Sequence, residues 1–253
     1  MVRALDPMQA LHQIRLAERP RLVLWPDDDR APAASSVALL AGSFDPVTVA
    51  HVALAEAARE HAGLVVALYS ARILPKEPGT PPALLDERER IETLAAVCAG
   101  REGLAAGLTS HGLLADQVAA AAGRFPRAAL SVVLGSDKLA QLLDPAWYED
   151  RERALATLFS SATVLYATRR GEEEAVARAV AEAAALGWED RVRRLDVPPG
   201  VAAVASRDVR DRARRGDDVS ALVPPEALGA VLAAARRERA TPGGPTTRPT
   251  GRR

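Results

Sequence analysis

The stretch from Ser36 to His51 constrains this chain more than any other, because it is typical of a strand, a tight turn and a helix start in immediate succession. Residues 37–41 are apolar without alternation, as in a central parallel strand that is covered on both faces. Gly42 permits a sharp turn and a close approach of the backbone to a ligand. The residues after Thr48 are rich in alanine and leucine and lack proline, which predicts a helix.

A helix that begins at the end of a central strand offers free N–H groups and the positive end of its dipole, so it attracts phosphate. Thr48 and His51 are three residues apart and share one side of the first helical turn. A hydroxyl and an imidazole would thus be added to the N–H groups. The stretch therefore predicts a phosphate site.

From residue 36 onward, strand-like and helix-like segments alternate along the chain, which predicts a parallel sheet with crossover helices. The expected fold class is α/β, with a Rossmann-like doubly wound sheet. The expected strands are 37–41, 64–68, 104–109, 129–134, 162–167 and 192–197. The expected helices are 48–58, 86–98, 113–122, 172–186, 207–214 and 225–237, and a further helix ends over 154–159.

The pattern divides the chain into one domain with two appendages. Residues 1–35 form an N-terminal extension with a short helical pattern and one edge strand near 21–25. Residues 36–239 form the domain itself. The tail, residues 240–253, is rich in Pro, Gly, Thr and Arg and is expected to be disordered.

Composition narrows the class of partner. Lys plus Arg and Asp plus Glu number 33 each, so the balance of charge favours neither nucleic acid nor a membrane surface as a partner. Cys98 is the only cysteine, which fits a reducing compartment, and we expect it to pack on a helix rather than to react. No run resembles a signal peptide or a membrane span, so a cytoplasmic location is the default expectation. A homo-oligomer remains open.

Residues 42–51 read G-S-F-D-P-V-T-V-A-H. They resemble the G-[ST]-F-D-P-x-[HT]-x-G-H signature of the nucleotidylyltransferase superfamily, with Ala50 in place of its last glycine. The resemblance implies that Thr48 and His51 are catalytic. It further implies an acceptor contact by Asp45, although an aspartate there is also a typical turn former. It implies contacts with ATP by Gly42, Ser43 and Phe44, of which Phe44 is also a typical packing residue.

Residues 135–139, G-S-D-K-L, resemble the G-A-D-x-L segment of nicotinate and nicotinamide mononucleotide adenylyltransferases. The resemblance implies that Asp137 holds the ribose of ATP. Residues 168–171, T-R-R-G, resemble that family's T-R-P-G. The resemblance also implies two acceptor contacts. One is Trp147, which would stack on the pyridine ring but could equally be a packing residue, and the other is Lys76, which could equally be a solvated loop residue.

Residues 204–210, V-A-S-R-D-V-R, resemble the I-S-S-T-x-I-R motif of the same enzymes. The resemblance implies that Ser206 and Arg210 grip the triphosphate, with Arg210 counted among the catalytic groups. Arg207 adds a guanidinium that suits phosphate, and it could equally be a solvated helix residue. Residues 216–225 are instead closer to pantetheine-phosphate adenylyltransferases.

The sequence therefore predicts an adenylyltransferase that moves AMP from ATP to a phosphorylated small-molecule acceptor, most simply nicotinate mononucleotide. Mg²⁺ is the expected cofactor, bound through the ATP phosphates, and no protein metal ligand is predicted. A pantetheine-phosphate adenylyltransferase is the first alternative. The departures at Ala50, Ala205 and Arg207 leave open a non-catalytic nucleotide-binding protein.

Overall fold

The structure, a computed structural model, describes residues 6–26, 34–72, 82–144 and 150–240. Seven strands form one sheet in the order β1-β4-β3-β2-β5-β6-β7. All neighbouring pairs are parallel except β1 and β4, which are antiparallel. This is the Rossmann-like α/β class expected from the sequence, with an added edge strand. The strands are β1 (Leu22–Leu24), β2 (Ser36–Gly42), β3 (Leu64–Ser70), β4 (Leu104–Thr109), β5 (Ala129–Gly135), β6 (Ala162–Ala167) and β7 (Val192–Arg194).

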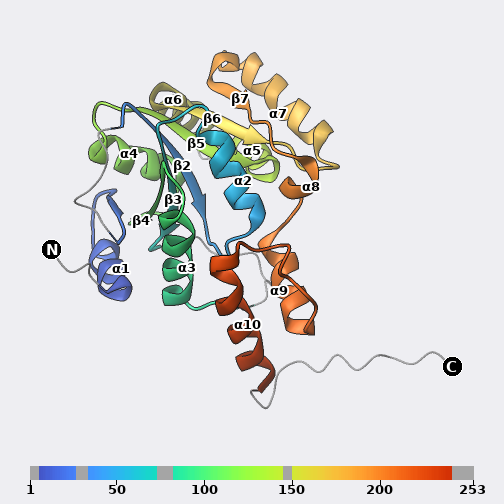
Figure 1. Cartoon of the computed structure of the whole chain (residues 1–253). Helices are drawn as coiled ribbons and strands as arrows, with labels where there is room; N and C mark the ends of the chain where they lie inside the picture. The colour runs from blue at the N-terminus through green and yellow to red at the C-terminus, as the bar shows by residue number, and fades with distance from the viewer. Residues whose placement is uncertain (1–5, 27–33, 73–81, 145–149, 241–253) are drawn as a thin grey trace.

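Helices cover both faces of the sheet (Figure 1). α1, α2, α3 and α8 pack on one face, and α4, α5, α6 and α7 pack on the other. The helices are α1 (Pro7–Arg15), α2 (Val49–Ala58), α3 (Glu87–Ala99), α4 (Leu114–Arg124), α5 (Ser136–Leu143), α6 (Arg151–Ser161), α7 (Glu173–Ala185), α8 (Pro199–Ala202), α9 (Ser206–Arg215) and α10 (Pro225–Ala240), with a 3₁₀ turn at Glu189–Arg191.

β2 is the central strand, and its side chains reach both layers of helices. Val37 and Leu39 are fully buried in the cluster that includes residues of α4, α6 and α7. Ala38 and Leu40, which point the other way, lie in the cluster that contains residues of α2. An apolar run without alternation is what burial on both faces requires, so this prediction is confirmed.

The N-terminal extension joins the edge of the sheet. β1 pairs with β4, with Leu22 opposite Thr109, which confirms the expected edge strand. Leu11 and Ile14 of α1 are buried in a cluster with residues of α3. Arg15 donates to the carbonyl of Ala71 at 2.9 Å, just beyond the end of β3.

α9 and α10 lie beyond the end of the sheet to which the β2 arrow points (Figure 1). They form their own apolar cluster, in which Val209 and Val231 pack with Leu84 and Leu85 from the segment before α3. α10 continues to Ala240, the first residue of the tail, and residues 241–253 lie outside the described part. None of the helices in the described ranges is long and apolar enough to cross a membrane.

The last strand and one helix differ from the sequence prediction. β7 ends at Arg194 rather than at residue 197, and one further hydrogen bond joins the chain to β6, from the Leu195 N–H to the Tyr166 carbonyl at 2.7 Å. Proline suits the first turn of a helix, where its missing N–H would have no partner, and the unpredicted α8 begins at Pro199.

Candidate active site

The segments that the sequence singled out meet at the carboxyl ends of the strands. The strand order reverses between β2 and β5, which is where ligands bind in open α/β sheets. We call residues 42–48 the phosphate loop; they connect β2 to α2. The start of α5 and the residues after β6 follow two successive strands on one side of β2 in the sheet, and the start of α9 contacts the loop directly.

Thr48 and His51 are joined in a reciprocal cap at the start of α2. The Thr48 N–H donates to His51 Nδ1 at 3.0 Å, and the Thr48 hydroxyl lies 2.9 Å from the same nitrogen. Since Nδ1 accepts a backbone N–H, it carries no proton, and the neutral ring has its proton on Nε2. Thr48 is fully buried. Its hydroxyl therefore orients His51, and the group left to donate to a ligand is the Nε2–H of His51.

His51 is neutral at physiological pH. Burial, and to a smaller extent the positive charge of Arg169, lowers the pKa of His51 from 6.5 to about 4. Its edge-to-face contact with Phe44, with ring centroids 5.2 Å apart, adds apolar surroundings. The imidazole thus presents a hydrogen-bond donor without the charge of an imidazolium.

Gly42 and Phe44 shape the phosphate loop. Phe44 has a φ of +43°, a left-handed conformation that is unusual for a bulky residue and that the surrounding packing must hold. Its ring is buried and lies so close to Gly42 that a Cβ on Gly42 would be 3.0 Å from two ring carbons. Phe44 therefore packs under the loop rather than facing a nucleotide base. Ser43, between them, is exposed.

Asp45 was expected to contact the acceptor, but its side chain points into the protein. Its carboxylate is fully buried and accepts the N–H groups of Leu84 and Leu85, at 3.1 and 2.9 Å. Two guanidinium groups, from Arg90 and Arg210, lie 3.8 and 3.5 Å from it. With these partners Asp45 anchors the loop, in place of the acceptor contact that the resemblance implied.

The start of α9 reaches the phosphate loop from the opposite direction. The Ser206 hydroxyl donates to the carbonyl of Pro46 at 2.9 Å, and Arg210 Nη1 donates to the carbonyl of Asp45 at 2.7 Å. Arg210 is buried, whereas the side chain of Arg207 is 73% exposed. Ser206 thus lies next to the loop, and Arg210 contacts the loop itself.

Asp137 and Arg169 lie together beyond β5 and β6. Arg169 Nη1 is 3.7 Å from the carboxylate of Asp137, and both side chains are partly exposed. The buried hydroxyl of Ser136 accepts the Arg169 N–H at 3.1 Å and donates to Glu172. Arg169 and Ser136 were not among the predicted site residues. The sequence could have indicated both, because each lies two residues after the end of an expected strand, 129–134 for Ser136 and 162–167 for Arg169.

Two further expectations lie outside the described residues, namely Lys76 and Trp147. Within the described ranges, no group of three or more His, Cys, Asp or Glu side chains could hold a metal ion. Ala50, the departure from the signature, is buried in α2.

The fold is that of a nucleotide-binding α/β protein in which a helix, α2, begins close to the carboxyl end of the central strand β2. Residues 39–106 match the family model described as cytidylyltransferase-like. Over 192 residues the chain is 30% identical to a "Probable nicotinate-nucleotide adenylyltransferase" of Symbiobacterium thermophilum. The matched region covers 74% of this chain and 88% of that protein. The chain is 32% identical over 211 residues to a protein of the same name from Laribacter hongkongensis. That match covers 75% of this chain and 89% of the relative.

The chain belongs to the nucleotidylyltransferase family and stands close to the nicotinate-nucleotide adenylyltransferases. It is a nucleotidylyltransferase enzyme.

Proposed function

We propose that this enzyme transfers AMP from ATP to nicotinate mononucleotide. An oxygen of the acceptor's phosphate forms a bond to the α-phosphorus of ATP, the bond from that phosphorus to the bridging oxygen breaks, and pyrophosphate leaves. The acceptor phosphate is already an anion, so the reaction needs alignment and charge stabilisation rather than a general base. The names of the two relatives support this acceptor.

The observation that carries the proposal is the reciprocal cap of Thr48 and His51 at the start of α2. It presents a neutral Nε2–H beside the helix N-terminus, where charge on the α-phosphate would be stabilised. Arg169 adds a positive charge close enough to act on the pKa of His51. We assign the His51 Nε2–H, the N-terminus of α2 and Arg169 to the α-phosphate.

The other half of the triphosphate would lie against α9. Its first residue, Ser206, has its hydroxyl bonded to the phosphate loop, and the N-cap position holds Ala205, which makes no side-chain cap. The N–H groups of the first turn therefore suit the leaving pyrophosphate. Arg207, largely exposed beside them, suits its charge.

Asp137 remains our assignment for the ribose of ATP, and Lys76 and Trp147 remain our assignments for the acceptor. Mg²⁺ fits the site only as an ion carried by the triphosphate, because the described residues offer no cluster of protein ligands. When bound, it would neutralise charge on the phosphate oxygens.

The test is an assay of pyrophosphate release by the full chain with ATP, Mg²⁺ and one acceptor at a time. We expect turnover with nicotinate mononucleotide, less with nicotinamide mononucleotide and none with phosphopantetheine. His51→Ala should lower kcat by about 10²-fold with little change in Tm, because it removes a preorganised donor.

Turnover with phosphopantetheine alone would establish the alternative acceptor. Binding of ATP without pyrophosphate release from any acceptor would instead point to a non-catalytic nucleotide-binding protein.

A further inference from the structure

The N-terminal extension contacts the ligand-binding end of the sheet as well as its edge. Arg15, in the last turn of α1, donates from Nε to the carbonyl of Ala71 at 2.9 Å, one residue beyond the end of β3. In return, Arg72 donates from Nη2 to the carbonyls of Arg15 and Ala17 at 3.1 and 3.0 Å. Each of the two arginine side chains thus holds the backbone next to the other. We call these contacts the extension joint.

Arg15 also holds the start of α3. Its Nη2 donates to the carboxylate of Glu87, the first residue of that helix, at 2.7 Å. At the next position, Arg88 donates to the carboxylate of Asp6, the residue that caps α1, at 2.7 Å. β3 ends at residue 70 and α3 begins at residue 87. The extension therefore contacts the chain at both ends of the connection between β3 and α3.

These polar contacts fix where the backbone of the connection lies more than they stabilise the fold. Arg15 and Glu87 are 41% and 32% exposed, and ion pairs in such positions contribute little to stability. The apolar face of α1 contributes more, because Leu11 and Ile14 are buried in the cluster that also contains Phe44 of the phosphate loop. Substitution of one arginine should therefore leave the protein folded while it releases the connection.

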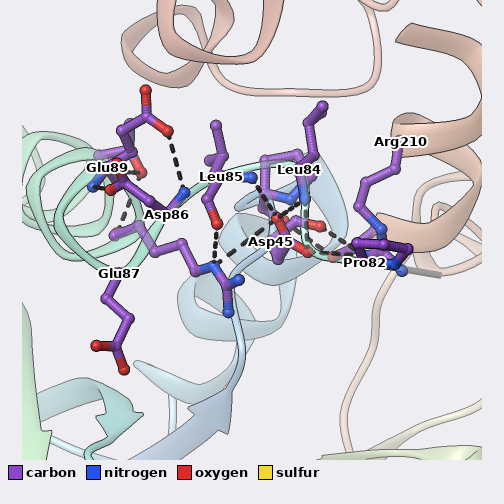
Figure 2. Close-up of polar contacts among 12 residues, drawn as sticks. Asp45, Pro82, Leu84, Leu85, Asp86, Glu87, Glu89 and Arg210 are labelled. Carbon is purple, nitrogen blue, oxygen red and sulfur yellow. Dashed lines mark hydrogen bonds and ion pairs between the residues drawn. The ribbon is translucent and has the colours of Figure 1, made fainter. Parts of the chain in front are cut away.

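The second end of the connection leads directly to the phosphate loop. Figure 2 shows Leu84 and Leu85 beside Asp45, and Glu87 pointing away from it. The N–H groups of Leu84 and Leu85 donate to the Asp45 carboxylate at 3.1 and 2.9 Å. The short span 84–87 thus contacts the phosphate loop through its backbone and α1 through the side chain of Glu87.

The extension joint lies on the half of the sheet that we assign to the acceptor. Asp137, our assignment for the ribose of ATP, follows β5. β3 and β4 lie on the other side of β2, across the point where the strand order reverses. Arg72 extends the joint to β4, because its Nη1 donates to His111 Nε2 at 3.0 Å, two residues beyond the end of that strand. The joint is therefore on the side of the acceptor rather than on the side of ATP.

We infer that Arg15 and Arg72 position the connection between β3 and α3, and that the N-terminal extension thereby sets the affinity of the enzyme for its acceptor. The extension precedes residue 39, where the match to the family model begins. The kinetic consequence rests on the proposed function, whereas the hold on the connection can be tested without turnover.

The first test measures how firmly the connection is held. Endoproteinase Lys-C cleaves after lysine, and the lysines of the full chain are Lys76, in this connection, and Lys138, in α5. We expect Arg15→Gln and Arg72→Gln each to raise the rate of cleavage after Lys76 by about threefold or more, because a segment released at its ends opens more often. Cleavage after Lys138 should keep its wild-type rate. Arg19→Gln removes an exposed arginine of the same extension and should change neither rate.

Unchanged cleavage after Lys76 in both variants would overturn the inference. Equal acceleration after Lys76 and Lys138 would also overturn it, because it would show general destabilisation instead of a released connection.

The second test separates the two substrates in turnover. With Arg15→Gln, we expect the KM for the acceptor to rise about three- to tenfold, as the loss of one or two hydrogen bonds at an anchor would produce. The KM for ATP and kcat should stay within about twofold, because the phosphate loop and its cap on α2 are unchanged. Arg19→Gln is again the control. A rise in both KM values, or a lower Tm with both KM values unchanged, would make the contacts structural only and would contradict the inference.

The double variant distinguishes positioning from direct binding of the acceptor by Arg72, which is exposed. If the two arginines act as one joint, Arg15→Gln combined with Arg72→Gln should raise the acceptor KM as much as either single change, whereas independent roles give effects that multiply. A rise confined to Arg72→Gln would mark Arg72 as an acceptor ligand and overturn the inference. If the unaltered enzyme turns over no acceptor, the proposed function fails, and the Lys-C rates alone decide this inference.

Discussion

His51 illustrates how a single residue obtains its chemistry from its neighbours. Its ring is half-buried and neutral because the surrounding protein removes much of its solvation and so lowers its pKa, and its tautomer follows from the Thr48 N–H that points at Nδ1. The histidine of a free peptide would be half protonated near pH 6.5. The donor that we assign to the α-phosphate is thus set by the cap and by burial together.

The depressed pKa of His51 also predicts how stability depends on pH. The unfolded chain takes up a proton at His51 below pH 6.5, whereas the folded chain does so only near pH 4. The stability contributed by the neutral, half-buried ring is therefore present above pH 6.5 and is lost as pH falls toward 4. Urea unfolding at pH 4.5 to 7.5 should show the free energy of unfolding of the wild type falling more steeply toward acid pH than that of His51→Gln. Parallel curves would show that His51 titrates alike in both states.

Substitution of Gly42 tests how tightly Phe44 packs under the phosphate loop. A Cβ there would lie 3.0 Å from two ring carbons of Phe44, a ring that is buried and cannot swing into solvent. Gly42→Ala should therefore lower kcat by about tenfold, because the ring and the His51 that it contacts must shift. Gly123→Ala is the control, since nothing lies within 4 Å of a Cβ there. It should stabilise α4 by about 0.5–1 kcal/mol at unchanged kcat. Equal kcat for both variants would show that the loop tolerates the methyl group.

At the scale of elements, the start of α5 and the residues after β6 form one unit. One buried hydroxyl, that of Ser136, joins them by accepting the Arg169 N–H and donating to Glu172. Asp137 and Arg169 lie on opposite sides of this joint and face each other at 3.7 Å. Ser136 stands where the G-A-D-x-L segment that residues 135–139 resemble has alanine.

Ser136→Ala should separate the two elements. We expect the KM for ATP to rise about three- to tenfold, since one hydrogen bond to a charged group contributes about 1.5–3 kcal/mol and the loop relaxes in part. The KM for the acceptor should barely change. Ser160→Ala, which removes an exposed hydroxyl on α6, serves as the control. A lower Tm with both KM values unchanged would make Ser136 a structural residue only.

At the scale of the whole molecule, the chain has two places where segments far apart in sequence complete the fold. α9 and α10 pack on the segment before α3, and the extension adds α1 and β1 at the β4 edge of the sheet. The ion pair of Arg88 with Asp6 also joins the extension to α3, but both side chains are about 40% exposed, so it contributes little. Apolar burial holds the extension in place.

The substitution Leu11→Ala measures how much this apolar burial contributes to stability. It is fully buried between α1 and the sheet, so Leu11→Ala should lower the free energy of unfolding by about 2–5 kcal/mol. Leu16 is 67% exposed, and Leu16→Ala should change it by less than about 0.5 kcal/mol. Urea unfolding provides both values, and kcat should be the same for all three proteins where they are folded. A small effect of Leu11→Ala would mean that the extension detaches at little cost.

The sequence by itself determined the features that depend on neighbours along the chain. The apolar run of β2, the turn at Gly42 and the helix after Thr48 are local, and their succession was sufficient to predict a phosphate site at the end of a parallel strand. The alternation of strands and helices predicted the fold class for the same reason.

Only the tertiary structure decided what the charged residues of the site contact. Asp45 and Arg210 are 165 residues apart, and Ser136 and Arg169 are 33 apart, so no local pattern could pair them. Asp45 was predicted to face a ligand. A motif shows that a carboxylate is present but not which way it points, so the sequence could not show that this one is buried. Its direction follows from the burial of Leu84 and Leu85 against α9 and α10, which brings their N–H groups to the carboxylate. Packing between segments that are distant in sequence thus separates the residues that would contact substrate from those that hold the loop.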